Sequence, residues 1–483
     1  MPVLILLLIP FLAATLLMVA RPTKAARGIA LIASLATLGV ALWLWCTHPG
    51  QEVTLFQQEW VPSWGLSFKL GFDGTGLLMV LLTAVVFPFI VAAGFKQDLQ
   101  HPSLVNALLL YAQSFMLGVF TAQNALLFYI FYELSMLPVF FLLLYWGGER
   151  RRGITVRFFI YTLLGGLALL FGIAYCVVQE PAHNADFSAL SALALPANVQ
   201  VWLFWALFLA FAIKLPIFPF HGWQPDTYTM APLQGAMVLG GVMLKMGLFG
   251  ALRFVFPIVP EGVAFWRDTV IWLSLIGAIY AAVIAFRQRD LKRLVAYSSL
   301  AHVGLLAAGL FAWNSYGVSG SLYQAFAHAV LVVAMFYIVG ALKERTGSSE
   351  LAAMGGLKSK APRLAALFMF VVANAVALPL TQSFVGEWLM FNGLWQLEGG
   401  GWMALAGVST IVLGAIYMLF AYQRAMLGPD RWKLEVRDAD TTDHLFLVPL
   451  IAVTLLLGVY PAPILDLVDA PVQLLLSSFP VPH

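Results

Sequence analysis

The sequence AIKLPIFPFHGWQPD, residues 212–226, places a lysine and two prolines at the end of a long apolar run. The preceding VWLFWALFLAF (201–211) carries no charge, and with this stretch it is long enough to cross a bilayer. Lys214 stands where a spanning helix should be most apolar, and Pro216 and Pro219 each remove a backbone donor after it. A lysine beside a helix break at membrane depth is costly unless it faces protein or water. We therefore expect a titratable group on an ion path; the alternative is a lysine that snorkels from a helix end.

The composition is that of a polytopic helical membrane protein. Of the 483 residues, 61% are hydrophobic and 10% are charged, and the mean hydropathy is +0.90. A soluble domain of this length does not have such a composition, so we predict an all-α membrane fold. Cys46 and Cys176 lie in apolar runs and fit neither a disulfide framework nor a metal site. The N-terminal run, residues 1–22, lacks a basic start and a small-residue cleavage motif, and it predicts a retained first helix.

Apolar runs of roughly 18–25 residues predict about fourteen transmembrane helices. We expect these helices near residues 2–20, 28–47, 77–95, 104–121, 123–145, 156–178, 200–220, 232–254, 267–286, 293–312, 319–341, 363–390, 403–425 and 444–462. The longest polar-leaning connection is 48–76, and the apolar, proline-containing tail after residue 462 is consistent with an interfacial helix.

Lysine and arginine are distributed unevenly among the connections. Connections after even-numbered helices contain chiefly Lys69 and Arg267, whereas those after odd-numbered helices contain most of the others. The latter are Arg21, Lys24, Arg27, Lys96, Arg150, Arg151, Arg152, Arg157, Arg287, Arg289, Lys292, Arg293, Lys343, Arg345, Lys358, Lys360, Arg363, Arg424, Arg431, Lys433 and Arg437. Because positive connections stay inside, both termini should face outward, on the periplasmic side of a bacterial inner membrane.

An internal repeat is visible in two Leu-Pro pairs. Leu215-Pro216 in the seventh predicted helix matches Leu378-Pro379 in the twelfth, and the same shift carries helices four to six onto nine to eleven. With an odd number of helices per unit, the second copy starts on the opposite face, so the repeat is inverted, as in transporters with paired broken helices. The resulting divisions are 1–100 (helices 1–3), 104–254 (first repeat, helices 4–8), 267–425 (second repeat, helices 9–13) and 426–483 (helix 14 and the tail).

Several ionisable residues lie inside predicted helices that otherwise avoid charge. In chain order they are Glu133, Lys214, Lys245, His302, His328 and Glu387. Singly, each has a structural explanation, such as a hydrogen-bonded core histidine or a glutamate kept protonated by desolvation. As a set they favour stepwise proton transfer, which needs groups whose pKa values are displaced by burial and by one another. The wide spacing of the histidines, without a carboxylate at ligand spacing, argues against a metal site.

Three further ionisable residues, Asp73, His221 and Asp226, lie at predicted helix ends. We interpret the two aspartates as helix caps or turn-formers rather than as sites of proton uptake. The basic cluster between 287 and 293 is interpreted as a topology signal.

Long motifs extend over nearly the whole chain. They are FYELSMLPVFFLLLYWGGE (131–149), KLPIFPFHGWQPD (214–226), GVMLKMGLFGALRF (241–254), DLKRLVAYSSLAHVG (290–304), QAFAHA (324–329), FVGEW (384–388) and YPAPILD (460–466). They resemble the antiporter-like membrane subunits of respiratory complex I and, among these, the subunit M family of NADH–quinone oxidoreductase. Glu387 favours that family, because subunits L and N resemble each other in carrying lysine there. The chain also ends soon after helix fourteen, without the lateral helix expected of subunit L.

The resemblance implies a role for each buried ionisable residue. Glu133 and Lys214 match the paired acid and base of the family, and Lys245 matches its connecting lysine. His302 and His328 match the relay histidines of the family, and Glu387 matches its terminal acid. Two segments, TYTMAP (227–232) and LPLTQS (378–383), depart from the family pattern and leave the shape of the second break open.

The implied function is proton translocation driven by quinone reduction elsewhere in the complex. This chain would hold no redox cofactor, with NADH, FMN, iron–sulfur clusters and quinone in other subunits. Its partners would be the neighbouring antiporter-like subunits and membrane lipids, and not nucleic acid. Two alternatives remain: a subunit of a Mrp-type cation/proton antiporter, and a structural membrane scaffold whose buried charges only pair with one another.

Overall fold

The structure is a computed structural model that describes residues 1–97, 99–428 and 436–479. Arg431 and Lys433, which the charge distribution includes among the basic residues, lie outside the described residues, as does the end of the tail. The chain divides into two compact units.

The described residues confirm the predicted all-α membrane fold. They contain 13 helices that are long and apolar enough to cross a membrane, and one shorter apolar helix, α18 (Pro362–Ala375). Together with α19 (Gln382–Trp395), α18 supplies the remaining predicted segment in two halves. The inverted relation of the repeats and the fourfold division of the chain stay predictions.

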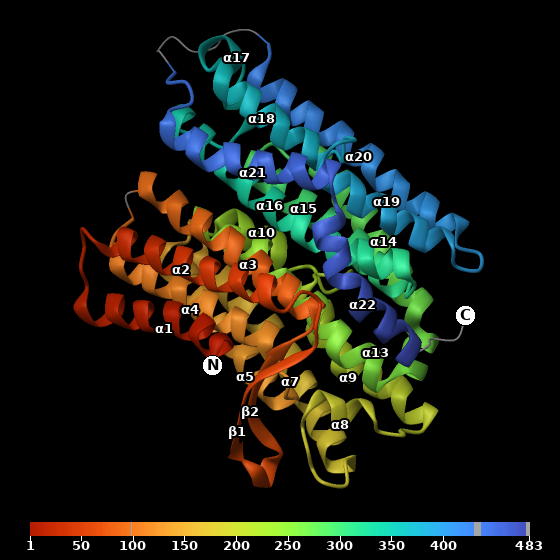
Figure 1. The fold of residues 1–483 in the computed structure, drawn as a ribbon. Coiled ribbons are helices and arrows are strands. Elements are labelled where there is room, and N and C mark those ends of the chain that lie inside the picture. Colours follow the sequence, from red (N-terminus) through yellow and green to blue (C-terminus); the bar gives the residue numbers. More distant parts are fainter. Residues whose placement is uncertain (98, 429–435, 480–483) are drawn as a thin grey trace. The chain divides into compact units, whose positions relative to one another are not determined.

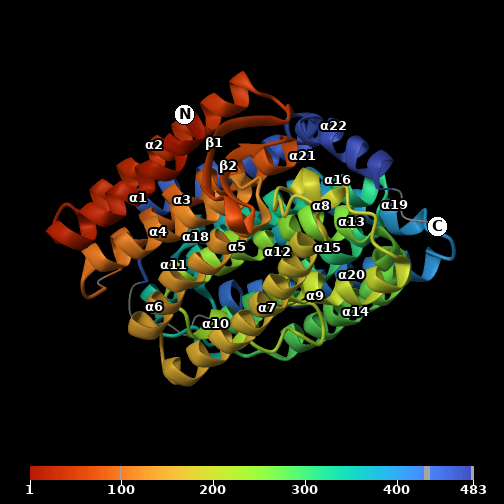
Figure 2. The same ribbon diagram turned by 90° about the horizontal axis from the view of Figure 1, so that it is seen from below.

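The first unit comprises Met1–Pro216, Met230–Val270 and Asp466–His483. In it α1, α2 and α4 lie side by side (Figures 1 and 2). Its elements are α1 (Pro2–Ala20), α2 (Ala26–Thr47), β1 (Val53–Val61), η1 (Pro62–Trp64), β2 (Leu66–Phe72), α3 (Gly74–Ala93), η2 (Gly94–Lys96), α4 (Pro102–Thr121), α5 (Ala125–Leu134), α6 (Met136–Trp146), α7 (Arg151–Gln179), α8 (Phe187–Ser191), α9 (Ala197–Lys214), α11 (Leu233–Val238), η3 (Leu239–Met243), α12 (Leu244–Gly250), η4 (Ala251–Val255) and α13 (Phe256–Ile258).

The second unit comprises Ile217–Thr229 and Ile271–Leu465. Within it α18 packs against α20 and α21 (Figure 1). Its elements are α10 (Gln224–Met230), α15 (Leu291–Phe311), α16 (Ser315–Thr346), η5 (Leu351–Ala353), α17 (Leu357–Lys360), α18, α19, α20 (Gly401–Met426) and α21 (Thr441–Val459). Among the described residues, α14 (Pro260–Arg287) and α22 (Ala462–Ser478) contribute residues to both units, and the last residue of α10, Met230, belongs to the first unit.

Polar residues define where many of the spanning helices begin. Asn124 accepts hydrogen bonds from the backbone N–H groups of Leu126 and Leu127 at the start of α5. Asp290 caps α15 in the same way, and Asp440 forms a capping box at the start of α21. Such caps satisfy helix donors that have no partner within the helix. The starts of these helices are therefore specified by the local sequence.

The connection 48–76 contains an antiparallel hairpin that the sequence reading did not anticipate. Strands β1 and β2 pair over Val53–Val61 and Leu66–Phe72. The turn between them contains Gly65, at φ +65°, which glycine adopts without the penalty that a Cβ brings. The sequence also did not predict η3 and η4, two π-helical turns within the span from Leu233 to Ile258.

Both predicted helix breaks are present. Helix α9 ends at Lys214, directly before Leu215-Pro216, and residues 215–223 are not helical. In the second unit residues 376–381 separate α18 from α19, with Ala377 and Leu380 at positive φ values of 50° and 78°. Such values are costly for residues with a Cβ and persist where surrounding packing holds them. Here α21 supplies that packing, because a Cβ on Gly458 would collide with the carbonyl of Leu380.

Candidate proton-transfer site

In the first unit the ammonium group of Lys214 lies over an aromatic ring. Its Nζ atom is 4.2 Å from the centroid of the Tyr132 ring, and Lys214 is 2% exposed. Nζ has no hydrogen-bond partner among the described residues, so the ring face supplies its nearest attraction. Tyr132 is itself held in place, because its hydroxyl donates to the carbonyl of Ala210 on α9 at 3.0 Å. The lysine is thus enclosed by α5 and its own helix rather than snorkelling.

Glu133 follows Tyr132 in α5 and interacts electrostatically with Lys214. No carboxylate–ammonium contact of ion-pair length is present between these two described residues, so they do not form a direct salt bridge. The Glu133 carboxylate packs against Gly166 of α7, where a Cβ would collide with it. The predicted acid and base are therefore neighbours, with the ring of Tyr132 beside the ammonium group.

Lys245 lies on α12, next to the helix of Lys214. A Cβ on Gly247 would be 3.1 Å from the Cβ of Lys214, so the two helices approach closely at this point. The Nζ of Lys245 donates to the carbonyl of Gly240 at 2.7 Å. Gly240 belongs to η3, one of two π-helical turns that flank the lysine, and π-turns recur at functional sites. The π-turn thus supplies the acceptor that a buried ammonium group needs.

In the second unit His302 and Glu387 are in direct contact. His302 Nδ1 and Glu387 Oε1 lie 3.0 Å apart, with side chains 11% and 3% exposed. The same carboxylate oxygen accepts a longer hydrogen bond, 3.5 Å, from the side-chain amide of Gln324 on α16. Nε2 of His302 has no partner among the described residues. An imidazole with one ring nitrogen on a carboxylate and the other free can pass a proton between its two sides.

His328 completes the cluster from α16. Its ring centroid is 5.9 Å from that of His302, and its Nε2 is 3.2 Å from the hydroxyl of Ser299. Ser299 and His302 are three residues apart on α15, so they share one face of that helix. On the same helix Ser298 accepts a hydrogen bond from the hydroxyl of Tyr417 on α20 at 3.0 Å.

Two small cavities adjoin His302. One, of about 10 Å³, is also lined by Glu387, Thr410 and Tyr417. The other, also about 10 Å³, is lined by Ser299 and His328 among others. A cavity of about that volume accommodates one water molecule when polar groups surround it. His302 therefore lies between two water-sized spaces, one toward each of its ionisable neighbours.

The structure thus gathers the predicted residues into local groups. Glu133 and Lys214 are neighbours beside Tyr132 without a direct salt bridge, and His302, His328 and Glu387 form one cluster. The spans that carry Lys245, His328 and His302 are strongly enclosed. In the most apolar part of each span, 100%, 94% and 89% of the residues, respectively, are buried. Lys245 and His302 belong to different compact units, and a transfer between them stays a prediction.

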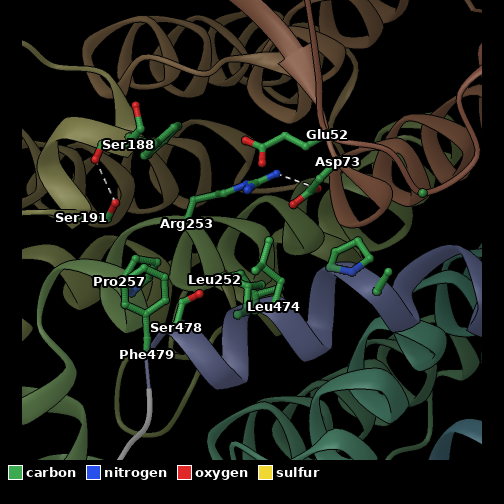
Figure 3. A pocket seen from close by; sticks show the side chains of 15 residues that line it. Glu52, Asp73, Ser188, Ser191, Leu252, Arg253, Pro257, Leu474, Ser478 and Phe479 are labelled. Atoms are coloured by element: carbon green, nitrogen blue, oxygen red, sulfur yellow. Dashed lines mark hydrogen bonds and ion pairs between the residues drawn. The ribbon is translucent and has the colours of Figure 1, made fainter.

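Sequence reading missed Arg253, which pairs with Asp73 beside a larger cavity (Figure 3). The guanidinium Nη2 lies 2.7 Å from Asp73 Oδ1. The cavity, of about 360 Å³, is also lined by Glu52, Ser188 and Leu474, among others. A single arginine near the end of an apolar span was the available signal, because a charge there needs a counter-charge.

Asp73 is a helix cap, as predicted, and an ion-pair partner in addition. Its carboxylate accepts from the backbone of Gly76 at 2.8 Å and from the Thr75 hydroxyl at 2.7 Å. Burial alone would raise the pKa of Asp73, but the Arg253 guanidinium and these hydrogen bonds outweigh it and lower that pKa below its usual value. Asp226 lies in the first turn of α10, 3.3 Å from Arg293.

These features define the class of protein: a polytopic membrane protein with ionisable side chains enclosed beside broken helices, as ion-translocating subunits have. The family model described as NADH:quinone oxidoreductase/Mrp antiporter, transmembrane, matches residues 122–414. The chain belongs to this family. It is 36% identical over 426 residues to NADH-quinone oxidoreductase subunit M of Rickettsia bellii, covering 87% of this chain and 85% of that protein.

Solved structures show the same fold. A chain of respiratory complex I from Thermus thermophilus superposes with a TM-score of 0.90 at 30% identity, covering 98% of this chain and all of that chain (100%). A chain of the Mrp complex from a Dietzia species has a TM-score of 0.84 at 23% identity, covering 98% of this chain but 52% of its own length. The second likeness concerns the fold alone.

Proposed function

We propose that this chain is a proton-translocating membrane-arm subunit of a complex I-type NADH–quinone oxidoreductase. The observation that carries the proposal is the enclosed His302–Glu387 contact with His328 beside it. It occurs in a chain that corresponds end to end to a complex I subunit. Proton transfer needs titratable groups at hydrogen-bond or one-water spacing, shielded from lipid. Quinone reduction in other subunits would drive the transfers.

We assign the proton path in the order of the chain. In the first unit the charged carboxylate of Glu133 stabilises the ammonium form of Lys214. When Glu133 becomes neutral, this stabilisation is lost and Lys214 releases its proton. Lys245 takes the proton onward to His328 and His302. Glu387 is the terminal acid, which receives the proton from His302 Nδ1. The water-sized cavities on both sides of His302 support one-water transfers to its neighbours.

The proposed exit is on the outer side, with both termini facing outward. Helix α18 starts beside Arg363, in a basic connection assigned to the inner side. Glu387 lies in the following half-helix, α19, beyond the break. At about 1.5 Å per residue along each half, it is well over halfway across. This arrangement and the similarity to bacterial proteins support a bacterial inner membrane.

Redox chemistry is assigned to other subunits of the complex. In the described part of the chain no group of three His, Cys, Asp or Glu side chains is placed to hold a metal ion. NADH, FMN, the iron–sulfur clusters and quinone would bind elsewhere. The proposed partners are neighbouring antiporter-like subunits and membrane lipids, without a role for nucleic acid.

The second candidate is a subunit of a Mrp-type cation/proton antiporter, favoured by the shared family model. The decisive experiment is the subunit composition of the complex purified through a tag on this chain. Hydrophilic iron–sulfur subunits support the complex I assignment, whereas a complex made entirely of membrane subunits contradicts it. A structural scaffold is the third candidate. Neutral substitutions of the buried charges would then impair assembly rather than proton transport.

A further inference from the structure

A fourth cavity lies at the ends of α1 and α4, and its lining includes none of the residues assigned to proton transfer. Its volume is about 350 Å³, and it is lined by Leu17, Met18, Arg21, Thr23, His101, Ser103 and Leu104. We call it the Arg21 cavity. Its apolar lining residues are Leu17, Met18 and Leu104, and its polar lining residues lie at or just beyond the ends of two adjacent spans. A volume of this order is typical of small-ligand pockets.

The two helices that form the Arg21 cavity are fixed against each other. The Thr15 and Tyr111 hydroxyls lie 2.9 Å apart, and the Ser114 hydroxyl donates to the carbonyl of Leu7 at 2.9 Å. Phe11 packs edge to face on Tyr111. The cavity is therefore bounded by helices with a defined spacing.

Positive charge dominates this end of the two helices. Arg21 directs Nε to the carbonyl of Met18 at 3.3 Å, and among the described residues no carboxylate pairs with its guanidinium. Residues 1–51 contain no aspartate or glutamate, and neither do residues 99–132. The acid nearest in the chain, Asp98, lies outside the described residues. A guanidinium without a carboxylate is suited to a phosphate, which it can bind through two parallel hydrogen bonds.

A buried hydroxyl without a partner adjoins the same cavity. Ser103 is 5% exposed, and its Oγ has no hydrogen-bond partner among the residues that the structure describes. Leaving such a group unsatisfied costs free energy, and a bound acceptor would remove that cost. Ser103 also lies in the first turn of α4, which no side chain caps. Helix N-termini favour negative charge through their free N–H groups and dipole.

The Arg21 cavity also has an apolar side, formed by Leu17, Met18 and Leu104. Because the cavity lies at the ends of two apolar spans, the first carbons of an acyl chain can pack against these side chains. A cationic rim, an unsatisfied hydroxyl and an apolar side match the junction of headgroup and acyl chain in a phospholipid.

We propose that the Arg21 cavity binds the headgroup of an anionic phospholipid. The phosphate oxygens accept hydrogen bonds from the Arg21 guanidinium and the Ser103 hydroxyl, and the start of an acyl chain packs against Leu17, Met18 and Leu104. The excess positive charge, which includes Lys24, selects net-negative headgroups over zwitterionic ones. With the orientation proposed above, the site lies in the inner leaflet. It contributes a lipid contact that does not depend on any proton-transfer residue.

Photo-crosslinking tests the site in the intact purified complex. The complex is reconstituted in phosphatidylcholine nanodiscs that contain a small fraction of phosphatidylglycerol or phosphatidylcholine with a diazirine on one acyl chain. After illumination, peptides from α1 and α4 are analysed by mass spectrometry. We expect labelling by phosphatidylglycerol well above that by phosphatidylcholine. Arg21→Gln should lower the excess about fivefold, the effect of one cationic side chain near a membrane surface.

Two variants separate the site from general surface charge. Lys24→Gln removes a nearby charge that does not line the cavity, and it should lower labelling much less than Arg21→Gln. Leu104→Trp fills the cavity while keeping every charge, and it should abolish the excess labelling. The complex should keep its electron-transfer rate in all three variants. Equal labelling by both lipids, equal effects of the two charge variants, or loss of labelling in excess inorganic phosphate would each overturn the proposal.

Discussion

Glu387 and His302 meet through a single hydrogen-bond contact, 3.0 Å from Oε1 to Nδ1, although α19 and α15 are far apart in the sequence. The same carboxylate oxygen faces the Gln324 amide, so it is held from two helices. A proton can therefore pass between the two side chains at this contact without an intervening water molecule.

Replacing Glu387 should stop proton transfer while leaving the complex assembled. Glutamine keeps the shape and can still hydrogen-bond to His302, but it cannot carry a proton. We expect Glu387→Gln to lower proton translocation at least about 100-fold, the lower end of the range for loss of an acid–base group. The measurement is dye-monitored proton uptake by proteoliposomes that contain the purified complex. Glu387→Asp, which keeps the chemistry with a shorter reach, should retain partial activity; equal pumping by both variants would exclude Glu387 from the path.

The position of the Glu133 carboxylate can be altered without changing any charge. A Cβ on Gly166 would collide with that carboxylate, so Gly166→Ala should displace Glu133 from Lys214. The matched control is Gly153→Ala on the same helix, where a Cβ meets nothing within 4 Å. We expect pumping to fall in the first variant and to stay normal in the second. Glu133→Gln sets the lower limit, and a Gly166→Ala complex that pumps normally would show that the spacing does not matter.

Variants of Lys245 test whether pumping needs a side chain that can release a proton at this position or only a positive charge. Lys245→Met keeps most of the length and removes the charge, so it should block pumping. Lys245→Arg keeps the charge but cannot release a proton at accessible pH, and it should fail as well. Coupled electron transfer and proton uptake are measured together on the same preparations. Robust pumping by the arginine variant would assign Lys245 a purely electrostatic role.

The Asp73–Arg253 pair should contribute to the stability of the first unit. Asp73→Asn keeps a competent cap but leaves Arg253 without its counter-charge, at a cost of about 1–3 kcal/mol. Asp73→Ala also removes the cap and should cost about 1 kcal/mol more. Thermal unfolding of the chain in detergent, followed by circular dichroism, measures both. Identical unfolding of the parent and Asp73→Asn would show that the pair contributes nothing.

The stabilisation by this pair should depend on pH in a defined direction. Folding lowers the pKa of Asp73, so the unfolded chain binds its proton more tightly than the folded chain. The contribution is therefore complete above the unfolded pKa, about 4, and is lost as the pH falls through the lower folded value. The difference between the parent and Asp73→Asn should be constant near neutral pH and shrink below about pH 4. A difference that grows on acidification would contradict this assignment.

Local chemistry made much of the fold predictable. Lengths of apolar sequence predicted the spans, and the Leu-Pro pairs predicted both breaks, because proline cannot continue a helix whose donors it removes. Asp73 was predictable as a cap because a short acceptor side chain precedes an apolar run. The buried ionisable residues were identified because charge is rare in such helices.

Features that depend on tertiary packing were not predictable in this way. The hairpin of β1 and β2 lies in a polar connection, and the contacts of Phe56 and Trp60 with Phe68 form across the turn only when the two strands pair. The contact of Lys214 with the Tyr132 ring depends on how α5 meets α9. The role of Arg253 could not be predicted from the sequence, because its ion-pair partner Asp73 is far away in the chain.

The π-turns η3 and η4 have a consequence for how this chain can change in evolution. Each is a helical turn with one residue more than an α-turn, and one lies on either side of Lys245. Deleting a single residue from either would tighten the helix and rotate everything beyond it by about 100°. Either Lys245 or Arg253 would then face a different neighbour. We therefore expect the segment between Pro232 and Val259 to tolerate most substitutions better than the deletion of a residue.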